Sequence, residues 1–337
     1  MNDATLAFLQ TLGATLDGDD CRFPAEPAFD ALGDADVIVP LSHYGILSIE
    51  GPEAEQFLQG QITCSAPGVT PALSSPGAYC TPKGRVVASF QLLRPRDDAF
   101  WLRMRGDLLE TAARAFGKYI VFSKAKLATV DLVGIGLHGA GVGAVLRDLL
   151  GALPETQHAT VGHGDGLLLR GDADGTRFEY WGPAAAATAL WSHCAPRCTA
   201  VGPHYWRHLQ IRAGNAEICA ATSELFLPHQ LNYHATGAIN FNKGCYTGQE
   251  IVARTHYRGQ VKRHLLCATV NGPAPAAGSA ITDTAGKAVG DVVNGVDIRP
   301  GAAEILAIVA DAVIDGESAD GPAVLRAGAA ELQVLAL

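Results

Sequence analysis

The stretch that decides the fold is "LPHQLNYHATGAINFNKGCYTGQEIVARTHYRGQVKRHL", residues 227–265. Within it, Thr247 and Glu250 have the spacing of a capping box, which predicts a helix that begins just after Thr247. The free backbone N–H groups of that helix would face Cys245, and Lys243 lies two residues before the thiol. The positive end of the helix and the lysine both favour the thiolate form of Cys245. The pattern predicts a turn that presents Cys245 as a nucleophile, soft ligand or redox group; the alternative is a buried residue at the helix entry.

Basic side chains follow the cysteine. Arg254 and Arg258 are four residues apart, and Lys262 and Arg263 lie beyond them, in a chain whose formal net charge is −9. Such a cluster is commonly a solvated face, but arginine also binds carboxylate and phosphate groups through paired hydrogen bonds. The segment therefore suits a dicarboxylate or phosphate partner.

The composition predicts a globular protein of two or three domains. The chain has 337 residues, of which 48% are hydrophobic and 18% charged, enough for a sizeable packed interior. The acidic charge argues against direct nucleic-acid binding. No apolar run spans a membrane, and the first residues lack the pattern of a signal or transit peptide, so we expect a cytoplasmic protein. The eight cysteines form no CxxC pair, which predicts reduced, mostly buried thiols.

Hydrophobic periodicity predicts three regions. Strand and helix patterns over residues 46–60 and 75–120 indicate a first α+β lobe, with two strands joined by a Pro-Lys-Gly-Arg turn. A second α+β lobe begins at about residue 127 with a strand over 129–137. After residue 265 the helical pattern disappears, and short apolar runs separated by turn residues predict a small all-β barrel or sandwich.

Two other motifs are weaker evidence for a binding site. "GIGLHG", residues 134–139, matches a dinucleotide-binding pattern, but Ile135 and Leu137 alternate with its glycines, which favours a glycine-containing strand. His193, Cys194 and Cys198 lie close in sequence, yet no second pair completes a zinc shell. We therefore expect neither a dinucleotide nor a metal site.

Residues 227–265 resemble the signature region of the YgfZ family of folate-binding proteins, relatives of the T-protein (aminomethyltransferase) of the glycine cleavage system. The most specific part is "KGCYTGQE", residues 243–250. Weaker likeness follows the family's order in "GPEAEQFLQGQIT", "YCTPKGRVVASFQLL", "GKYIVFSKAKL", "RFEYWGP" and "IRAG".

The resemblance implies an α+β fold that forms a ring of three domains around a central cavity for tetrahydrofolate or a derivative. Two α+β lobes and a C-terminal β-barrel make up the ring. The predicted boundaries are 1–126 together with about 205–260 for the first lobe, 127–204 for the second and 261–337 for the barrel.

The resemblance also implies site residues. "FEYWGP" looks like the T-protein segment whose glutamate contacts the pterin ring, which makes Glu179 the candidate here. Arg254 and Arg258 would suit the glutamate tail of folate, and Tyr246 could stack on a flat ring. The family motif places the following residues beside the cavity: Lys243, Cys245, Tyr246, Gln249 and Glu250.

The sequence departs from the T-protein at four positions. Ala88 and Ser89 align with its paired aspartates, one of which is the catalytic acid, so aminomethyl transfer lacks an evident acid–base group. Ser65 replaces an aspartate, and Arg212 replaces a common glutamate. The chain is therefore not expected to be an aminomethyltransferase.

The function that the resemblance implies is a folate-binding accessory protein. It would support iron–sulfur cluster assembly or repair, and so iron–sulfur-dependent tRNA modification, with iron–sulfur enzymes or cluster-assembly proteins as partners. Two alternatives stay open: a folate-dependent one-carbon transferase, and a thiol-redox or RNA-binding protein that acts through Cys245.

Overall fold

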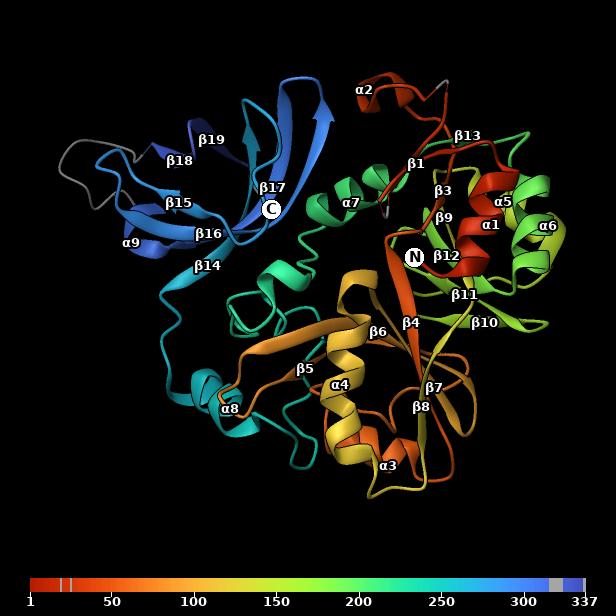
Figure 1. Ribbon diagram of the computed structural model, residues 1–337, viewed down its shortest axis with the longest axis horizontal. Helices are drawn as coiled ribbons and strands as arrows, with labels where there is room; N and C mark the ends of the chain where they lie inside the picture. The colour runs from red at the N-terminus through yellow and green to blue at the C-terminus, as the bar shows by residue number, and fades with distance from the viewer. Residues whose placement is uncertain (19, 25, 315–323, 336–337) are drawn as a thin grey trace. The chain divides into compact units, whose positions relative to one another are not determined.

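The computed structural model describes residues 1–18, 20–24, 26–314 and 324–335 (Figure 1). The chain forms two compact units. The first comprises Met1–Gly60, Ser65–Pro76 and Phe90–Trp206, and the second comprises Gln61–Cys64, Gly77–Ser89 and Arg207–Leu337. The predicted domain boundaries stay a prediction.

The first sheet has five strands in the order β5-β6-β7-β4-β8. These strands are β4 (Tyr44–Glu50), β5 (Ser75–Cys80), β6 (Val86–Arg96), β7 (Ala99–Arg105) and β8 (Lys126–Val130). Two helices accompany it, α3 (Ala54–Gln59) and α4 (Leu109–Ile120). Phe57 on α3 and Phe116 on α4 are buried, and their ring centroids are 6.2 Å apart. The strand and helix patterns predicted for this region are confirmed.

The second sheet has six strands in the order β10-β11-β12-β9-β3-β13. They are β3 (Val37–Pro40), β9 (Val133–His138), β10 (Thr160–His163), β11 (Gly166–Arg170), β12 (Arg177–Gly182) and β13 (Thr199–Ala200). Its core also takes in buried side chains of α1 (Asp3–Thr11), α5 (Val142–Leu150) and α6 (Ala184–Cys194). The single strand predicted over 129–137 is wrong. The first strand, β8, ends at Val130 and pairs with β4 in the first sheet. A second strand, β9, begins at Val133 and pairs with β12 in the second sheet.

The glycines of "GIGLHG" make room for two tryptophans. A Cβ atom at Gly134 would collide with the Trp181 indole, and one at Gly136 would lie 2.6 Å from the Trp206 ring. Asp36 occupies the start of α5, where its carboxylate accepts a hydrogen bond from Gly141 N at 2.9 Å. A carboxylate at that place takes the position that a phosphate would need. The prediction of a glycine-containing strand is confirmed.

The C-terminal region is a closed barrel in the order β14-β17-β16-β15-β18-β19, as predicted. Its strands are β14 (Arg263–Val270), β15 (Ala280–Thr282), β16 (Ala288–Arg299), β17 (Ala302–Ala310), β18 (Leu325–Ala327) and β19 (Ala330–Leu335). The remaining elements are β1 (Thr15–Asp17), β2 (Asp20–Arg22), α2 (Phe29–Leu32), α7 (Pro203–Arg212), α8 (Gln249–Arg258) and α9 (Asp311–Ile314). Within the described ranges, no helix combines the length and the apolar character needed to cross a membrane.

Arg212 has a partner that accounts for its charge. Its guanidinium lies 2.8 Å from Glu304 on β17, and His208 lies 3.1 Å from the other oxygen of the same carboxylate. Glu304 is 1% exposed. Burial raises its pKa, but the hydrogen bond and charge of His208 and the charge of Arg212 outweigh burial and lower the pKa overall. Arg212 thus compensates for the charge of a buried carboxylate of the barrel.

Candidate functional site

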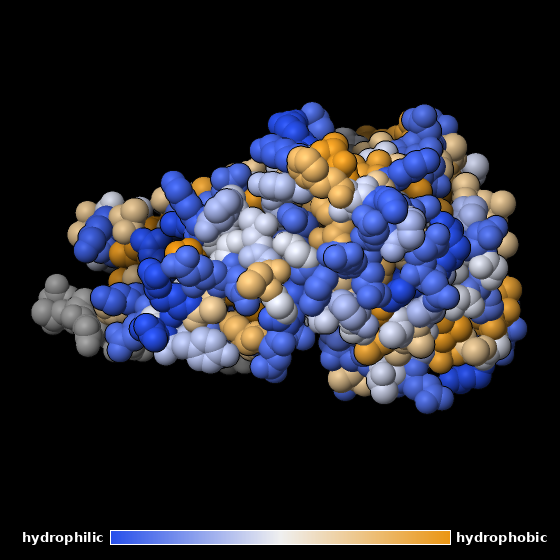
Figure 2. All heavy atoms as spheres, turned by 90° about the horizontal axis from the view of Figure 1, so that it is seen from below, coloured by the Kyte–Doolittle hydropathy of each residue, from blue (hydrophilic) through white to orange (hydrophobic). Residues whose placement is uncertain are grey.

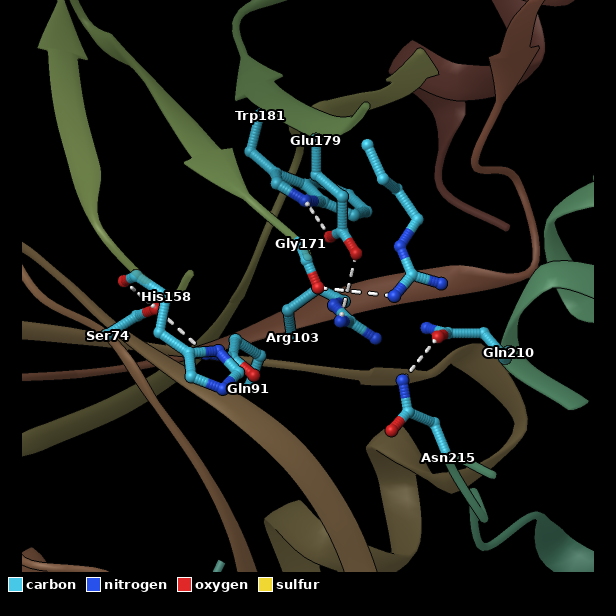
Figure 3. Close-up of polar contacts among 10 residues, drawn as sticks. Ser74, Gln91, Arg103, His158, Gly171, Glu179, Trp181, Gln210 and Asn215 are labelled. Carbon is cyan, nitrogen blue, oxygen red and sulfur yellow. Dashed lines mark hydrogen bonds and ion pairs between the residues drawn. The ribbon is translucent and has the colours of Figure 1, made fainter. Parts of the chain in front are cut away.

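Glu179 lies on β12 inside the second sheet, where it pairs with Leu169 and Gly136. Its carboxylate is buried and accepts one hydrogen bond at each oxygen. Arg103 Nη2 donates to Oε1 and Trp181 Nε1 donates to Oε2, both at 3.1 Å (Figure 3). The pterin contact proposed from the sequence therefore falls on a carboxylate held by two protein donors.

Arg103, on β7, is buried beside Glu179 and stacks its guanidinium 4.2 Å above the centre of the Tyr44 ring. A buried carboxylate is stable as an ion only when a positive charge and hydrogen bonds compensate for the loss of water. Arg103 supplies both. Because a carboxylate can accept about four hydrogen bonds, Glu179 still has acceptor capacity for a ligand.

A second polar cluster of the first unit surrounds Gln91, which pairs with Arg103 in the β6–β7 register. Gln91 Nε2 donates to Ser74 Oγ at 2.8 Å and lies 3.4 Å from His158 Nδ1 (Figure 3). Burial lowers the pKa of His158, and the charges of Arg177 and Arg103 lower it further, while Glu179 opposes them. The neutral imidazole is therefore the favoured form.

The sequence analysis did not single out Arg103, Gln91 or His158. A signal existed for the first two, because a charged or amide side chain stands inside the otherwise apolar runs "FWLRM" and "SFQLL". A buried polar residue in such a run needs a partner. His158 gives no comparable signal, since it lies in a polar loop before β10.

The signature segment begins α8 at Gln249, within one residue of the predicted start. The predicted capping box is wrong. Gly248, with φ of 85°, is the N-cap residue and makes no side-chain cap bond. Thr247 Oγ1 instead donates to Gln61 Oε1 at 3.4 Å, and Glu250 Oε1 accepts from Arg254 at 2.7 Å. The left-handed turn at the glycine replaces the capping geometry that the spacing suggested.

Gly248 also allows two backbones to approach closely. A Cβ atom there would lie 2.5 Å from Thr81 O and 3.3 Å from Gly84 Cα. A Cβ atom at Gly84 would in turn lie 2.9 Å from Ile251 on α8. The β5–β6 turn is thus packed directly against the start of α8, and two glycines make this contact possible.

Lys243 ties the signature segment to the stretch Gln61–Cys64. Its Nζ donates to Ile62 O and Cys64 O, both at 2.6 Å, and lies 5.2 Å from the centre of the Tyr246 ring. Burial lowers the pKa of Lys243 to about 8. Through its two hydrogen bonds, the Lys243 amine holds the Ile62 and Cys64 carbonyl groups in place.

All eight cysteines lie in the described part of the chain; seven are buried, and Cys245 is exposed. The prediction that Cys245 is presented at the surface rather than buried at the helix entry is therefore supported by its position. Tyr246 beside it is buried, with 8% of its surface exposed.

The candidate residues from the sequence fall in both units. Gln249 is half-buried, while Glu250, Arg254 and Arg258 are exposed on α8. Together with Lys243, Cys245 and Tyr246 these belong to one continuous segment of the second unit. Glu179 belongs to the first unit.

The positions aligned with the T-protein aspartates carry no carboxylate. Ala88 is fully buried. Ser89 Oγ accepts a hydrogen bond from Ile218 N at 2.9 Å. A methyl group and a hydroxyl engaged with the main chain provide no general acid at these positions.

A cluster of aromatic and histidine rings includes His256 of α8. His229 is 4% exposed, and its ring centroid lies 5.2 Å from that of His234 and 5.8 Å from that of His256. Phe241 stacks on His256 at 3.8 Å. Burial, helped by the two neighbouring histidines, lowers the pKa of His229 to about 4. This cluster (His229, His234, Phe241, His256) had no local sequence signal, since its members are far apart in the quoted stretch.

The chain has two mostly antiparallel sheets and a C-terminal closed barrel. These elements are typical of the aminomethyltransferase type of fold. The glycine cleavage system aminomethyltransferase T from Bartonella henselae has this fold with a TM-score of 0.78 and 17% identity, over 99% of this chain and 96% of its own. At that identity the likeness establishes the fold. No family model matches the chain.

Two partial matches are weaker. Heterotetrameric sarcosine oxidase from Corynebacterium sp. U-96 matches 48% of this chain and 82% of its own, with 15% identity and a TM-score of 0.34. The regulatory subunit of aspartate kinase from Thermus thermophilus matches 48% of this chain and 97% of its own, with 13% identity and a TM-score of 0.26. Neither score supports a functional argument.

Proposed function

We propose that this protein binds tetrahydrofolate or a derivative and acts as an accessory protein of the YgfZ type. It would support iron–sulfur cluster assembly or repair, and through it iron–sulfur-dependent tRNA modification. The observation that carries the proposal is the exposed Cys245 within "KGCYTGQE", in a chain with the aminomethyltransferase fold. Its partners would be iron–sulfur enzymes or cluster-assembly proteins, in the cytoplasm.

The buried Glu179 carboxylate supports the folate part of the proposal. The pterin of folate carries an amino group and a ring N–H side by side, which match the two oxygens of one carboxylate. Glu179 keeps acceptor capacity for such a pair, and Arg103 donates a charge-assisted hydrogen bond to it. Tetrahydrofolate, when bound, supplies nitrogen atoms that carry one-carbon units. Arg254 and Arg258 would receive the carboxylates of the folate tail.

The signature segment supports the part of the proposal in which Cys245 meets a partner protein. Lys243 anchors the segment through two carbonyl groups, and Gly248 fixes the turn into α8. Between these anchors Cys245 is exposed, so its thiol can meet a second protein. In this proposal Glu179 contacts the folate, and Cys245 acts on the partner protein.

The one-carbon transferase alternative lacks an acid–base group at the aligned positions, where Ala88 is buried and Ser89 bonds to the main chain. Direct RNA binding is opposed by the net charge of −9. Neither the transferase nor the RNA-binding alternative gains a specific observation from the structure, whereas the thiol-redox alternative shares the exposed Cys245 with the proposal.

The test of the accessory role is complementation of a deletion strain under oxidative stress. We expect the wild-type gene to restore iron–sulfur enzyme activity and methylthio-modified tRNA, and Cys245→Ser to restore neither although the variant accumulates normally. Gly244→Ala, in the same segment but without contacts within 4 Å of the added atom, is the matched control. A deletion strain with normal iron–sulfur enzyme activity would contradict the proposal.

A further inference from the structure

The end of α4 carries three exposed apolar side chains in four residues. Tyr119 is 42% exposed, Val121 72% and Phe122 85%. We call these residues the α4 tip. Single exposed apolar residues are common on protein surfaces, but a group of them marks an interaction site. On the face seen in Figure 2, apolar side chains form small groups among hydrophilic ones.

The chain that leaves the α4 tip is anchored. Lys124 N donates to Glu53 Oε2 at 2.8 Å, and Glu53 N donates to Lys124 O at 3.3 Å. Gly51, with φ of 133°, lies so close that a Cβ atom there would be 2.5 Å from Lys124 O. On the other side, α4 is packed through the buried Phe116. The apolar side chains are therefore presented by a fixed backbone, which reduces the entropy lost when a partner binds.

Lysines border the α4 tip. Lys118, Lys124 and Lys126 are exposed, and residues 118–126 contain no acidic residue. Lys124 lies 3.9 Å from Glu53. Within the residues that the structure describes, Lys118 and Lys126 make no ion pair. A basic border around an apolar centre in a chain of net charge −9 complements a partner with the opposite pattern.

We propose that the α4 tip docks into a partner protein that offers an apolar socket bordered by carboxylates. Phe122 would be the central anchor, since a few buried aromatic residues carry most of the energy of an interface. The lysine border would orient the partner and exclude others. This proposal requires neither folate nor Cys245, and it stands apart from the function proposed above.

Two other occupants fit the same surface less well. A bilayer with anionic lipids would also attract these lysines, but three lysines are fewer than the cluster of about 4–8 basic residues that is typical of anionic-lipid recognition. A second copy in a two-fold contact would place the two lysine borders against each other. Both are outcomes that the experiment separates.

The experiment begins with the photo-cross-linking residue p-benzoylphenylalanine at position 122 of the full chain in cells, with position 149 as control. Leu149, on α5, is 40% exposed and lies outside both the tip and the signature segment. We expect one protein cross-linked at position 122 and not at 149, through a peptide with apolar residues next to Asp or Glu. That protein is then purified and titrated with the unlabelled chain.

In the titration, Phe122→Ser and Lys126→Glu should each weaken binding at least about tenfold, while Lys126→Arg should retain it and all three variants should melt like the wild type. Any of the following would overturn the proposal: no cross-link at position 122; a cross-link only to a second copy; equal capture at both positions; or Phe122-dependent sedimentation with phosphatidylglycerol vesicles. Affinity unchanged by Phe122→Ser would do the same.

Discussion

Arg103 and Glu179 form a buried ion pair, with the guanidinium donating to the carboxylate across 3.1 Å. The two residues come from different sheets of the first unit, β7 and β12. Trp181 donates to the second oxygen at the same distance. The pair therefore links the two sheets through buried side chains of opposite charge.

Removing one partner of this pair should be costly. Arg103→Met leaves the Glu179 charge buried without compensation, and we expect a loss of about 3–5 kcal/mol in the free energy of unfolding. The double variant Arg103→Met, Glu179→Met removes both charges and should regain most of that loss. Urea unfolding followed by circular dichroism measures both. An Arg103→Met variant that unfolds at the wild-type midpoint would show that the pair contributes nothing.

The glycines of the signature segment should differ in their tolerance of alanine. Gly248→Ala places a Cβ atom 2.5 Å from Thr81 O on a backbone with φ of 85°, and we expect a loss of about 1–3 kcal/mol. Gly244→Ala meets nothing within 4 Å and should be nearly neutral. Thermal and urea unfolding of the two variants decide the matter, and equal effects would argue against the tight contact at the start of α8.

Lys243→Met should loosen the stretch Gln61–Cys64, because Ile62 O and Cys64 O each lose a hydrogen bond from the amine. We expect faster amide hydrogen exchange in residues 61–64 and a stability loss of about 1–3 kcal/mol. Lys243→Arg, which keeps the charge and donors, is the control. Unchanged exchange in Lys243→Met would contradict the anchoring role.

Acid should destabilise the protein through His229. Its pKa of about 4 in the fold lies below the ordinary value of about 6.5, so the fold holds the neutral ring. This contribution is complete above about pH 6.5 and is lost as the pH falls toward 4, by at most about 3 kcal/mol. The measurement is the free energy of unfolding between pH 7 and pH 4.5 for wild type and His229→Leu.

His229→Leu should be less sensitive to pH than the wild type across this range. His193→Leu, a histidine on α6 outside the cluster, should keep the wild-type slope. Parallel curves for wild type and His229→Leu would rule out His229 as a source of the acid sensitivity.

Local pattern was enough to predict several elements, because apolar spacing and turn residues are properties of short segments. It predicted the helix that buries Phe57 and the two strands on either side of Gly84. It failed at residues 129–137, where apolar residues continue through a point at which the chain passes from one sheet to the other. The sheet to which a strand belongs depends on its pairing with strands that are distant in sequence. The periodicity of a short segment carries no information about that pairing.

The candidate site was predictable only in part. The sequence predicted a turn that presents Cys245, with burial at the helix entry as the alternative, and the residue is exposed. The acceptors of Lys243 come from residues about 180 positions earlier in the chain, so no local signal announces them. The same holds for Arg103 and Glu179, whose contact depends on how two sheets pack.

The central claim is that the chain binds tetrahydrofolate through Glu179, and anaerobic calorimetric titration tests it most directly. We predict saturable binding to the wild type, at least about tenfold weaker binding to Glu179→Gln, and unchanged binding to Cys245→Ser. Melting curves confirm that each variant is folded. A wild-type protein that gives no heat of binding, or a Glu179→Gln variant that binds like the wild type, would contradict the claim.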